Sequence, residues 1–420
     1  MKYKAIKVML LPNNWQKSRL FQFAGASRFA YNWALHKEME SLNSGNWFIS
    51  DSVLRKEFTK LRNSEEYSWL QSISNNVTKQ AIKDLVKSYI RYFNLRKSEN
   101  YKPYTKKQIE HAKRIGKQLT EYDKQGHPKY KSRKNHTDCG FFQDNFKIQF
   151  TDSTVRIEKL CDSGNRSRRN VKCNVRLAEV GRIPILASYM NPRITFDGLH
   201  WWVSVVVEDS TDVTKYVPES DGIGLDVGIK DFAILSDSTK YANINKSSKI
   251  RRLEKRKRRL QKSISRKYVS NRKGGSYQKT NNIIKSEKSL LKLNKRLRNI
   301  RRNQRSHIVS DIINRKPRFI CIEDLNISGM MKNKHLSKSV QNQGFYDFRR
   351  LLEYNSDKYN IPLIVANRWY PSSKTCNCCG TIKKDLKLSD RIFRCDCGYS
   401  EDRDVNAAKN LKSYGELHLV

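Results

Sequence analysis

Three acidic residues stand where globular proteins rarely place a charge. Asp226 lies inside the apolar run GIGLDVGI (222–229), and Glu323 lies near the end of the apolar run RFICIEDL (318–325). Asp404 comes two residues before Asn406, where a helix is expected to begin. An unpaired buried charge costs several kcal/mol, so these carboxylates need a cationic partner. Converging carboxylates are typical ligands of Mg²⁺, and paired Mg²⁺ ions support in-line hydrolysis of a phosphodiester bond.

Each acid also has an ordinary interpretation when it is considered alone. Asp226 and Asp404 are also compatible with turn or helix-cap roles, and Glu323 with a lysine partner. It is the occurrence of all three in one strongly basic chain that favours the metal site. We therefore predict that Asp226, Glu323 and Asp404 are catalytic Mg²⁺ ligands.

Five of the nine cysteines gather between residues 376 and 397, as Cys376, Cys378, Cys379, Cys395 and Cys397. Glycine follows each group, at positions 380 and 398, which is typical of zinc knuckles. Four thiolates make a closed structural site, so we predict that Cys376, Cys379, Cys395 and Cys397 bind Zn²⁺, with Cys378 as the spare. A redox-active thiol pair is the alternative. The clustering and the lack of a secretion signal favour metal binding over a disulfide framework.

The charge of the chain points to a polyanionic partner. The 420 residues include 84 Lys or Arg against 41 Asp or Glu, a net charge of +43. Residues 246–305 hold 24 Lys or Arg and only two acids, Glu254 and Glu287, which is about half of the excess. Nucleic acid is the expected partner of such a surface. A structural ribosomal or chromatin-type protein is the alternative, but 20 Tyr, 16 Phe and 7 Trp argue against it. No apolar run is long enough to span a membrane.

Hydrophobic periodicity predicts the elements that position these residues. Helical spacing covers about 14–40 and 77–96, and period-two alternation covers five short segments, namely 146–150, 155–160, 171–177, 193–196 and 201–208. The short segments predict a small antiparallel barrel or sandwich, with 161–170 as a hairpin loop or insertion. Beyond residue 221 the pattern becomes α/β. Strands 222–229 and 232–235 should pair. A long basic helical stretch follows, and Gly274-Gly275 should break it into a helical hairpin. Buried parallel strands are expected at 318–325 and 361–367, joined by a helix through Phe348.

Seven motifs together resemble the transposon-encoded TnpB nucleases, RNA-guided relatives of compact type V CRISPR effectors. They are SRFAYNWAL (27–35), PKYKSRK (128–134), VGRIPI (180–185), GIGLDVGIKDFAIL (222–235), FICIEDLNISGMMKN (319–333), NRWYPSSKTCNCCG (367–380) and SDRIFRCDCGYSEDRDVNAAKNL (389–411). The match follows the order of the family along nearly the whole chain.

The resemblance implies an α/β multidomain fold with a RuvC-like, RNase H-type nuclease. It implies the first strand of a wedge β-barrel at 1–12, a helical recognition domain at 13–124 and the rest of the barrel at 125–220. The nuclease would occupy 221–375 and 399–420 and enclose a zinc ribbon at 376–398. The resemblance also selects Asp404 over Asp402 as the third acid, and it places Arg391 near the scissile strand.

The expected function is RNA-guided cleavage of DNA beside a short adjacent motif, with guide RNA and double-stranded target DNA as partners. Mg²⁺ would be catalytic and Zn²⁺ structural. We expect no membrane partner, no small-molecule substrate, a monomer on one RNA and a prokaryotic cytoplasmic, nucleoid-associated location. The alternatives are a nuclease-inactive RNA-guided DNA-binding regulator, a transposase or its accessory DNA-binding protein, and a purely structural RNA-binding protein.

Overall fold

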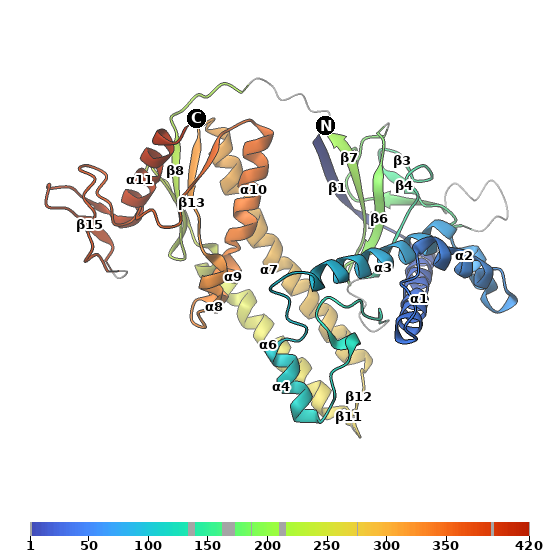
Figure 1. The fold of residues 1–420 in the computed structure, drawn as a ribbon. Helices are drawn as coiled ribbons and strands as arrows, with labels where there is room; N and C mark the ends of the chain where they lie inside the picture. Colours follow the sequence, from blue (N-terminus) through green and yellow to red (C-terminus); the bar gives the residue numbers. More distant parts are fainter. Residues whose placement is uncertain are drawn as a thin grey trace. The chain divides into compact units, whose positions relative to one another are not determined.

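The chain forms two compact units, Met1–Ser210 and Thr211–Val420. A computed structural model describes residues 2–132, 139–161, 173–185, 187–209, 216–274, 276–387 and 390–419 (Figure 1). No helix in these ranges is both long and apolar enough to cross a membrane. Each unit has its own sheet and its own buried core.

The first unit contains a seven-stranded antiparallel sheet in the order β2-β6-β7-β1-β5-β4-β3. Its strands are β1 (Lys2–Leu11), β2 (Cys139–Phe142), β3 (Gln149–Phe150), β4 (Thr154–Arg156), β5 (Asn174–Leu177), β6 (Met190–Phe196) and β7 (Trp201–Asp209). β1 pairs with β7 along nearly its whole length, so the start of the chain lies inside a sheet built mostly from residues beyond 138. The predicted antiparallel strands are present, but β3, β4 and β5 are shorter than their sequence patterns.

Four helices belong to the described part of this unit, and the first three share the core of the sheet. They are α1 (Asn14–Asn43), α2 (Asp51–Arg62), α3 (Asn75–Arg96) and α4 (Lys106–Ile115), with a kinked 3-10 segment at Glu65–Ser72 and a single 3-10 turn at Glu121–Asp123. Asn13 and Gln16 begin α1 with a reciprocal capping box. The ring of Phe23 on α1 lies 5.2 Å from that of Phe141 on β2, in one continuous apolar cluster.

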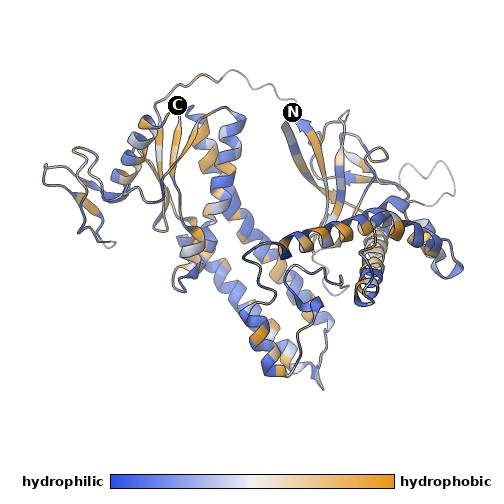
Figure 2. Cartoon of the chain, in the orientation of Figure 1, coloured by the Kyte–Doolittle hydropathy of each residue, from blue (hydrophilic) through white to orange (hydrophobic). Residues whose placement is uncertain are grey.

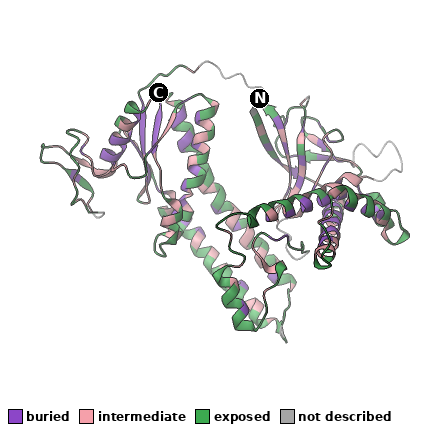
Figure 3. Cartoon of the chain, viewed as in Figure 1, coloured by how far each residue is buried: buried purple, intermediate pink, exposed green. Residues whose placement is uncertain are grey.

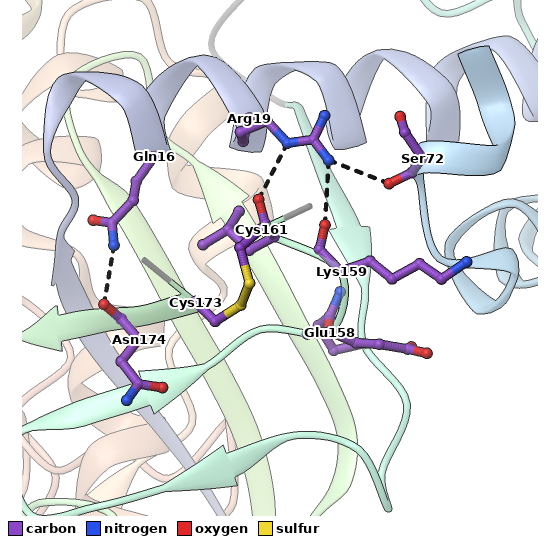
Figure 4. Close-up of a disulfide and its surroundings, with 10 residues drawn as sticks. Gln16, Arg19, Ser72, Glu158, Lys159, Cys161, Cys173 and Asn174 are labelled. Carbon is purple, nitrogen blue, oxygen red and sulfur yellow. Dashed lines mark hydrogen bonds between the residues drawn. A yellow bond between two sulfur atoms is a disulfide. The ribbon is translucent and has the colours of Figure 1, made fainter. Parts of the chain in front are cut away.

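One disulfide lies outside the predicted metal-binding cluster, at two cysteines to which the sequence analysis gave no role. Cys161 and Cys173 are bonded, and the predicted loop 161–170 between them lies outside the described residues except for Cys161 itself. Arg19 on α1 reaches the same place, because its guanidinium donates to the carbonyls of Lys159, Leu160 and Ser72 (Figure 4). Sequence spacing did not reveal this pairing, since a pair of cysteines outside the cluster carries no signal of its own.

The second unit contains a five-stranded mixed sheet in the order β10-β9-β8-β13-β14. The strands are β8 (Ile223–Val227), β9 (Asp231–Leu235), β10 (Lys240–Ala242), β13 (Ile320–Glu323) and β14 (Leu363–Ala366). β8, β13 and β14 run parallel, whereas β9 and β10 complete an antiparallel edge. The predicted pairing of 222–229 with 232–235 and the two parallel strands are therefore confirmed. β8, β9 and β13 are mostly apolar and buried, whereas β14 is partly buried and β10 is largely exposed (Figures 2 and 3).

Helices connect these strands. They are α6 (Ser248–Ser270), α7 (Asn281–Asn314), α8 (Ile327–Lys332), α9 (Ser337–Gln343), α10 (Phe345–Lys358) and α11 (Arg403–Leu417), with a 3-10 turn η4 at Ile244–Lys246. The short strands β11 (Arg272–Lys273) and β12 (Ser276–Tyr277) join α6 to α7 where the glycine pair predicted a break. β15 (Ile392–Arg394) and β16 (Ser400–Asp402) form a separate small hairpin.

The basic hairpin α6–α7 has little apolar material of its own. Its separate core is built from Ile250, Leu253, Leu293 and Leu297, while most of the remaining surface is hydrophilic (Figure 2). At its far end α7 joins the sheet core through Ile308, Val309, Ile312 and Ile313. The hairpin is thus anchored at one end by hydrophobic packing and presents lysines and arginines along the rest.

A buried carboxyl group gives the first unit a pH-dependent stability. Glu38 on α1 is fully buried, and its Oε2 accepts a hydrogen bond from the Ile49 N–H at 3.1 Å. Its other oxygen, Oε1, has no partner in the described part of the chain. Burial raises the pKa of Glu38 to about 7, although the Ile49 hydrogen bond acts in the opposite direction.

We expect Glu38→Gln to stabilise the first unit at pH 8 and to matter little at pH 5. The folded-state pKa of Glu38 lies above the unfolded value, so its stabilising contribution is complete at low pH and is lost as pH rises through about 7. The gain in unfolding free energy at pH 8 should reach up to about 3 kcal/mol. Urea unfolding at both pH values measures it. The exposed Glu40→Gln is the control, and equal shifts for both variants would contradict the argument.

Candidate active site and thiolate cluster

Two of the predicted acids lie on neighbouring parallel strands. β8 and β13 pair with Ile320 opposite Ile223 and Ile322 opposite Leu225. One further step along both strands places Glu323 beside Asp226. The third acid, Asp404, lies in the first turn of α11, a helix that packs against β8 and β13. The structure thus brings the three predicted acids to one edge of the second sheet.

The carboxylates act on one another electrostatically. Burial, followed by the nearby charges of Glu323 and Asp404, raises the pKa of Asp226 to about 7. Burial also raises the pKa of Glu323, and the adjacent Asp324 adds to the effect. Each of these shifts reports a site where negative charge is unfavourable without a cation. Such clustering of perturbed carboxyl groups is characteristic of functional sites.

The neighbouring acids have partners of their own. Asp402 caps α11 by accepting from the Asp404 N–H at 3.0 Å, and it forms an ion pair with Lys240 at 2.7 Å. Asp324 forms ion pairs with Arg349 at 2.8 Å and Arg368 at 2.5 Å. Asp404, by contrast, is one of the charges that raise the pKa of Asp226, which supports the choice of Asp404 over Asp402.

A close approach of backbones sets the distance between β8 and α11. A Cβ placed on Gly224 would lie 1.9 Å from the carbonyl oxygen of Ala408 and 2.4 Å from the backbone nitrogen of Lys412. Only glycine fits there, because both obstacles are main-chain atoms that no rotamer change can move. Gly224 precedes Asp226 by two residues, so this contact fixes where Asp404 stands relative to Asp226.

The carboxylate set suits a hard divalent cation, since carboxylate oxygens are the ligands that Mg²⁺ prefers. Among the described residues, however, only the four thiols form a group gathered closely enough to enclose a single ion. The chemistry of the carboxylate donors therefore fits a divalent cation such as Mg²⁺, whereas the thiols fit a softer ion.

The four predicted zinc ligands converge. The sulfur atoms of Cys376, Cys379, Cys395 and Cys397 all lie within 4.8 Å of one another, with 3.7 Å between Cys376 and Cys397 and 3.6 Å between Cys379 and Cys395. Tetrahedral zinc with Zn–S bonds of about 2.3 Å requires sulfurs about 3.8 Å apart. Cys378 is exposed and outside the group. The geometry matches the predicted ligand set and closed coordination.

Two left-handed glycines turn the backbone at the cysteine cluster, and Thr381 acts on Cys379 in particular. Gly380 and Gly398 adopt left-handed φ values of 75° and 90°, and their N–H groups donate to the carbonyls of Cys376 and Cys395. Hydrogen bonds from the hydroxyl and backbone of Thr381 lower the pKa of Cys379 to about 6. A thiol with this pKa is largely deprotonated at neutral pH, as a metal ligand must be.

Two buried asparagines join this cluster to the acidic site, and sequence analysis missed them. Asn406 Nδ2 donates to the Thr375 carbonyl at 2.8 Å, and Asn410 Nδ2 donates to the Thr375 and Ser372 carbonyls at 2.6 and 2.7 Å. Asn377 in turn donates to both asparagine side chains. These two asparagines of α11, the first only two residues after Asp404, therefore hold the backbone of the first cysteine knuckle, the segment that carries Cys376 and Cys379. Their spacing of four residues, one helical turn, is the signal that could have found them.

Arg391 remains without an assigned contact to the acids. Its side chain is exposed, while its carbonyl accepts a hydrogen bond from the Arg403 N–H at the start of α11. Its expected position near a scissile strand stays a prediction.

Three family models match the chain in order. A model described as a helix-turn-helix domain of OrfB from IS605 matches residues 1–46, a probable transposase model of the same family matches 203–334, and a Cas12f1-like TNB domain matches 345–411. In this structure residues 1–46 contain β1 and the single long helix α1. The last model spans the thiolate cluster and most of α11.

Relatives resemble the chain over nearly its full length. A Streptomyces pristinaespiralis protein named "Putative RNA-guided DNA endonuclease" is 27% identical and covers 98% of this chain and 89% of its own. The Escherichia coli K12 protein InsQ, with the same description, is 26% identical and covers 99% and 93%. A solved Cas12f1–sgRNA–target DNA complex has a TM-score of 0.50 at 15% identity, covering 98% of both chains. The resemblance derived from the motifs is confirmed, and so is the multidomain α/β fold.

We expect the purified protein to contain one zinc ion per chain and Cys379→Ser to lose most of it. Removing one thiolate leaves three ligands and an open position, which weakens a structural site. Elemental analysis of dialysed protein measures the zinc content. Cys378→Ser is the matched control one residue away and should retain zinc. Equal losses in the two variants would show that the ligand set is wrong.

Proposed function

We propose that this chain, which carries the domains of the TnpB family of IS605 transposons, is an RNA-guided DNA endonuclease. The observation that carries the proposal is the convergence of Asp226, Glu323 and Asp404 at one sheet edge of a chain with net charge +43. A basic protein recruits nucleic acid, and a cluster of unneutralised carboxylates within it serves metal-dependent hydrolysis better than binding.

The basic residues of both units would hold the nucleic acids by their backbones. Sequence choice would rest on base pairing between a guide RNA and the target strand, so the protein needs to hold backbones rather than read many bases. The lysines and arginines of both units supply that contact. We assign 1–12 and 125–220 to a wedge domain, 13–124 to recognition, 221–375 and 399–420 to the nuclease and 376–398 to the ribbon.

The acidic residues would hold the cleavage machinery. Bound Mg²⁺ would supply an activated water and charge stabilisation at the leaving oxygen. Asp226 and Glu323 come from adjacent strands and Asp404 from α11, so the packing of these elements orients the ligands before substrate arrives. The four cysteines would hold Zn²⁺ in a purely structural role, because no coordination position stays open. The partners and reaction place the protein at the nucleoid of a prokaryotic cell.

The alternatives fit the residues less well. A nuclease-inactive regulator has no need of the complete carboxylate set, and a structural RNA-binding protein has no need of acids in two apolar strands. A transposase or its accessory protein would act on transposon ends. Strand transfer of such ends by the purified protein would favour the transposase hypothesis over guided cleavage.

Asp226→Asn should abolish DNA cleavage while leaving the binding of guide RNA and target DNA unchanged. The substitution keeps the side-chain shape but removes one anionic metal ligand, and we expect a loss of roughly a thousandfold or more. Single-turnover cleavage of a guide-matched plasmid measures it, with binding followed by electrophoretic mobility. Asp221→Asn, at an exposed acid of the same unit, is the control. Full cleavage by the Asp226 variant would remove the nuclease assignment.

Gly224→Ala should lower cleavage at least tenfold with intact RNA binding. The added Cβ meets main-chain atoms of α11, so the helix must shift away from β8 and carry Asp404 with it. The same cleavage and mobility assays apply. Gly25→Ala is the control, since a Cβ there approaches only the end of the Arg28 side chain, at 3.9 Å. Unchanged cleavage would mean that the β8–α11 spacing does not govern the site.

A further inference from the structure

A basic pocket lies beyond the turn that follows β8. Its volume is about 570 Å³, and its walls come from the helices α6, α7 and α9, the 3-10 turn η4 and the residues next to it, and Ile229 in the β8–β9 turn. Asn243 and Ile250 are buried, whereas the cations of α6 and α9 are exposed at the rim. A polar and apolar floor beneath a charged rim is the usual form of a ligand site.

The charges of this pocket are almost entirely positive. Arg251, Lys255 and Arg258 follow one face of α6 at spacings of four and three residues, and Lys338 joins them from α9. Lys246 and Arg301 complete the cationic set, and Glu254 is the only acid. No carboxylate partner is recorded within the described residues for the side chains of Arg251, Lys255, Arg258 or Lys338.

The single acid is already neutralised. Glu254 forms an ion pair with Arg301 at 2.9 Å, and both side chains are largely buried. Arg301 also donates to Asn245 at 2.7 Å, and Asn245 donates to Gln343 at 3.1 Å. Gln343 ends this chain of contacts by donating to the Gly228 carbonyl at 3.2 Å. The acid therefore serves to hold the floor of the pocket and does not balance the rim.

Like charges at these spacings disfavour one another. Cations three or four residues apart on one helix face cost a few tenths of a kcal/mol per pair. Lys338 faces the same space from a second helix. An anion inside the pocket would turn this repulsion into attraction, and arginine in particular offers a planar fork that matches phosphate oxygens. The composition thus fits a phosphodiester backbone.

The pocket and the acids belong to the same end of the sheet. Ile229 follows Asp226 by three residues, about 10 Å of extended chain. α9 lies on the connection that leaves β13 after Glu323. Ligands of open α/β sheets bind outside the carboxyl ends of parallel strands, and β8 and β13 both end here. The wall of the pocket at Ile229 and the connection that carries α9 therefore both begin directly after strands that carry acids.

We propose that the pocket of Arg251, Lys255, Arg258 and Lys338 binds the phosphate backbone of the DNA strand that the second unit cuts. The inference rests on the proposed function for the identity of the strand, whereas the binding of a phosphodiester chain does not depend on cleavage. The buried contacts through Arg301, Asn245 and Gln343 hold the pocket floor to the turn after Asp226, so the bound backbone is placed relative to the carboxylates.

The test compares two triple variants of the same helix. R251A/K255A/R258A removes three pocket cations, and R252A/R256A/R259A removes three cations that do not line the pocket, with the same spacing and the same loss of charge. Both are made in the full-length RNA complex with Asp226→Asn, which prevents cleavage. The probe is a fluorescent single-stranded DNA of 20 nucleotides, and anisotropy gives its Kd from 50 to 300 mM salt. Circular dichroism checks folding.

The pocket variant should bind the probe at least tenfold more weakly at 150 mM salt, and the slope of log Kd against log salt should fall by about 2, roughly 0.7 per lost phosphate contact. The comparison variant should change Kd less than threefold. Equal effects would overturn the proposal by showing a diffuse basic surface. Loss of bound RNA from the pocket variant, measured by absorbance, would overturn it in favour of the guide. The protein with its native Asp226 is assayed for cleavage in parallel. If it does not cleave guide-matched DNA but the difference in Kd between the two triple variants persists, the proposed function fails and the phosphate site stands.

Discussion

The contact between β8 and α11 at Gly224 is the constraint on which the candidate active site depends. Three carboxylates of like charge resist being brought together. Burial first, and then the charges of Glu323 and Asp404, raise the pKa of Asp226 to about 7. The three carboxylates are held because each belongs to an element whose position is set by packing elsewhere. Glu323 is fixed by the parallel ladder of β13 with β8, and Asp404 by a helix that touches β8 backbone to backbone. Hydrophobic burial along the sheet and α11 outweighs the electrostatic cost.

In the α6–α7 hairpin, apolar packing and positive charge occupy different parts of the helices. Where α7 enters the sheet core it is apolar, and where it leaves the sheet it pairs with α6 through only a few leucines and isoleucines. The hairpin consequently gains little stability from burial, and its many cations repel one another. An extended basic arm of this kind is best stabilised by a bound polyanion. The same feature that weakens the free protein is the one that favours nucleic acid.

Local patterns predicted the parts of the structure that local chemistry determines. The acids stood out because apolar strands rarely contain charge, and the thiols because their spacing to glycine is short-range. The strands of both sheets followed from period-two and apolar runs. What escaped prediction depends on residues far apart in sequence. Asn410 meets Ser372 across 38 positions, and Gln343 meets Gly228 across 115. The Cys161–Cys173 pair and the basic pocket likewise exist only once the fold brings their residues together.

The asparagines of α11 link the two metal-binding arrangements. Asp404 lies in the first turn of this helix, and Asn406 and Asn410, two and six residues further along, hold the backbone of the first cysteine knuckle. The ribbon is inserted between β14 and α11, so its fold determines how the chain enters the helix that carries the third acid. Four thiolates closed around one ion would fix the knuckle, the knuckle would fix the asparagines, and the asparagines would fix the helix. In the proposed metal-loaded enzyme, the structural ion would contribute to the geometry of the catalytic site without sharing a ligand with it. This arrangement would explain why the cysteine-bearing insertion stands immediately before the helix that carries Asp404.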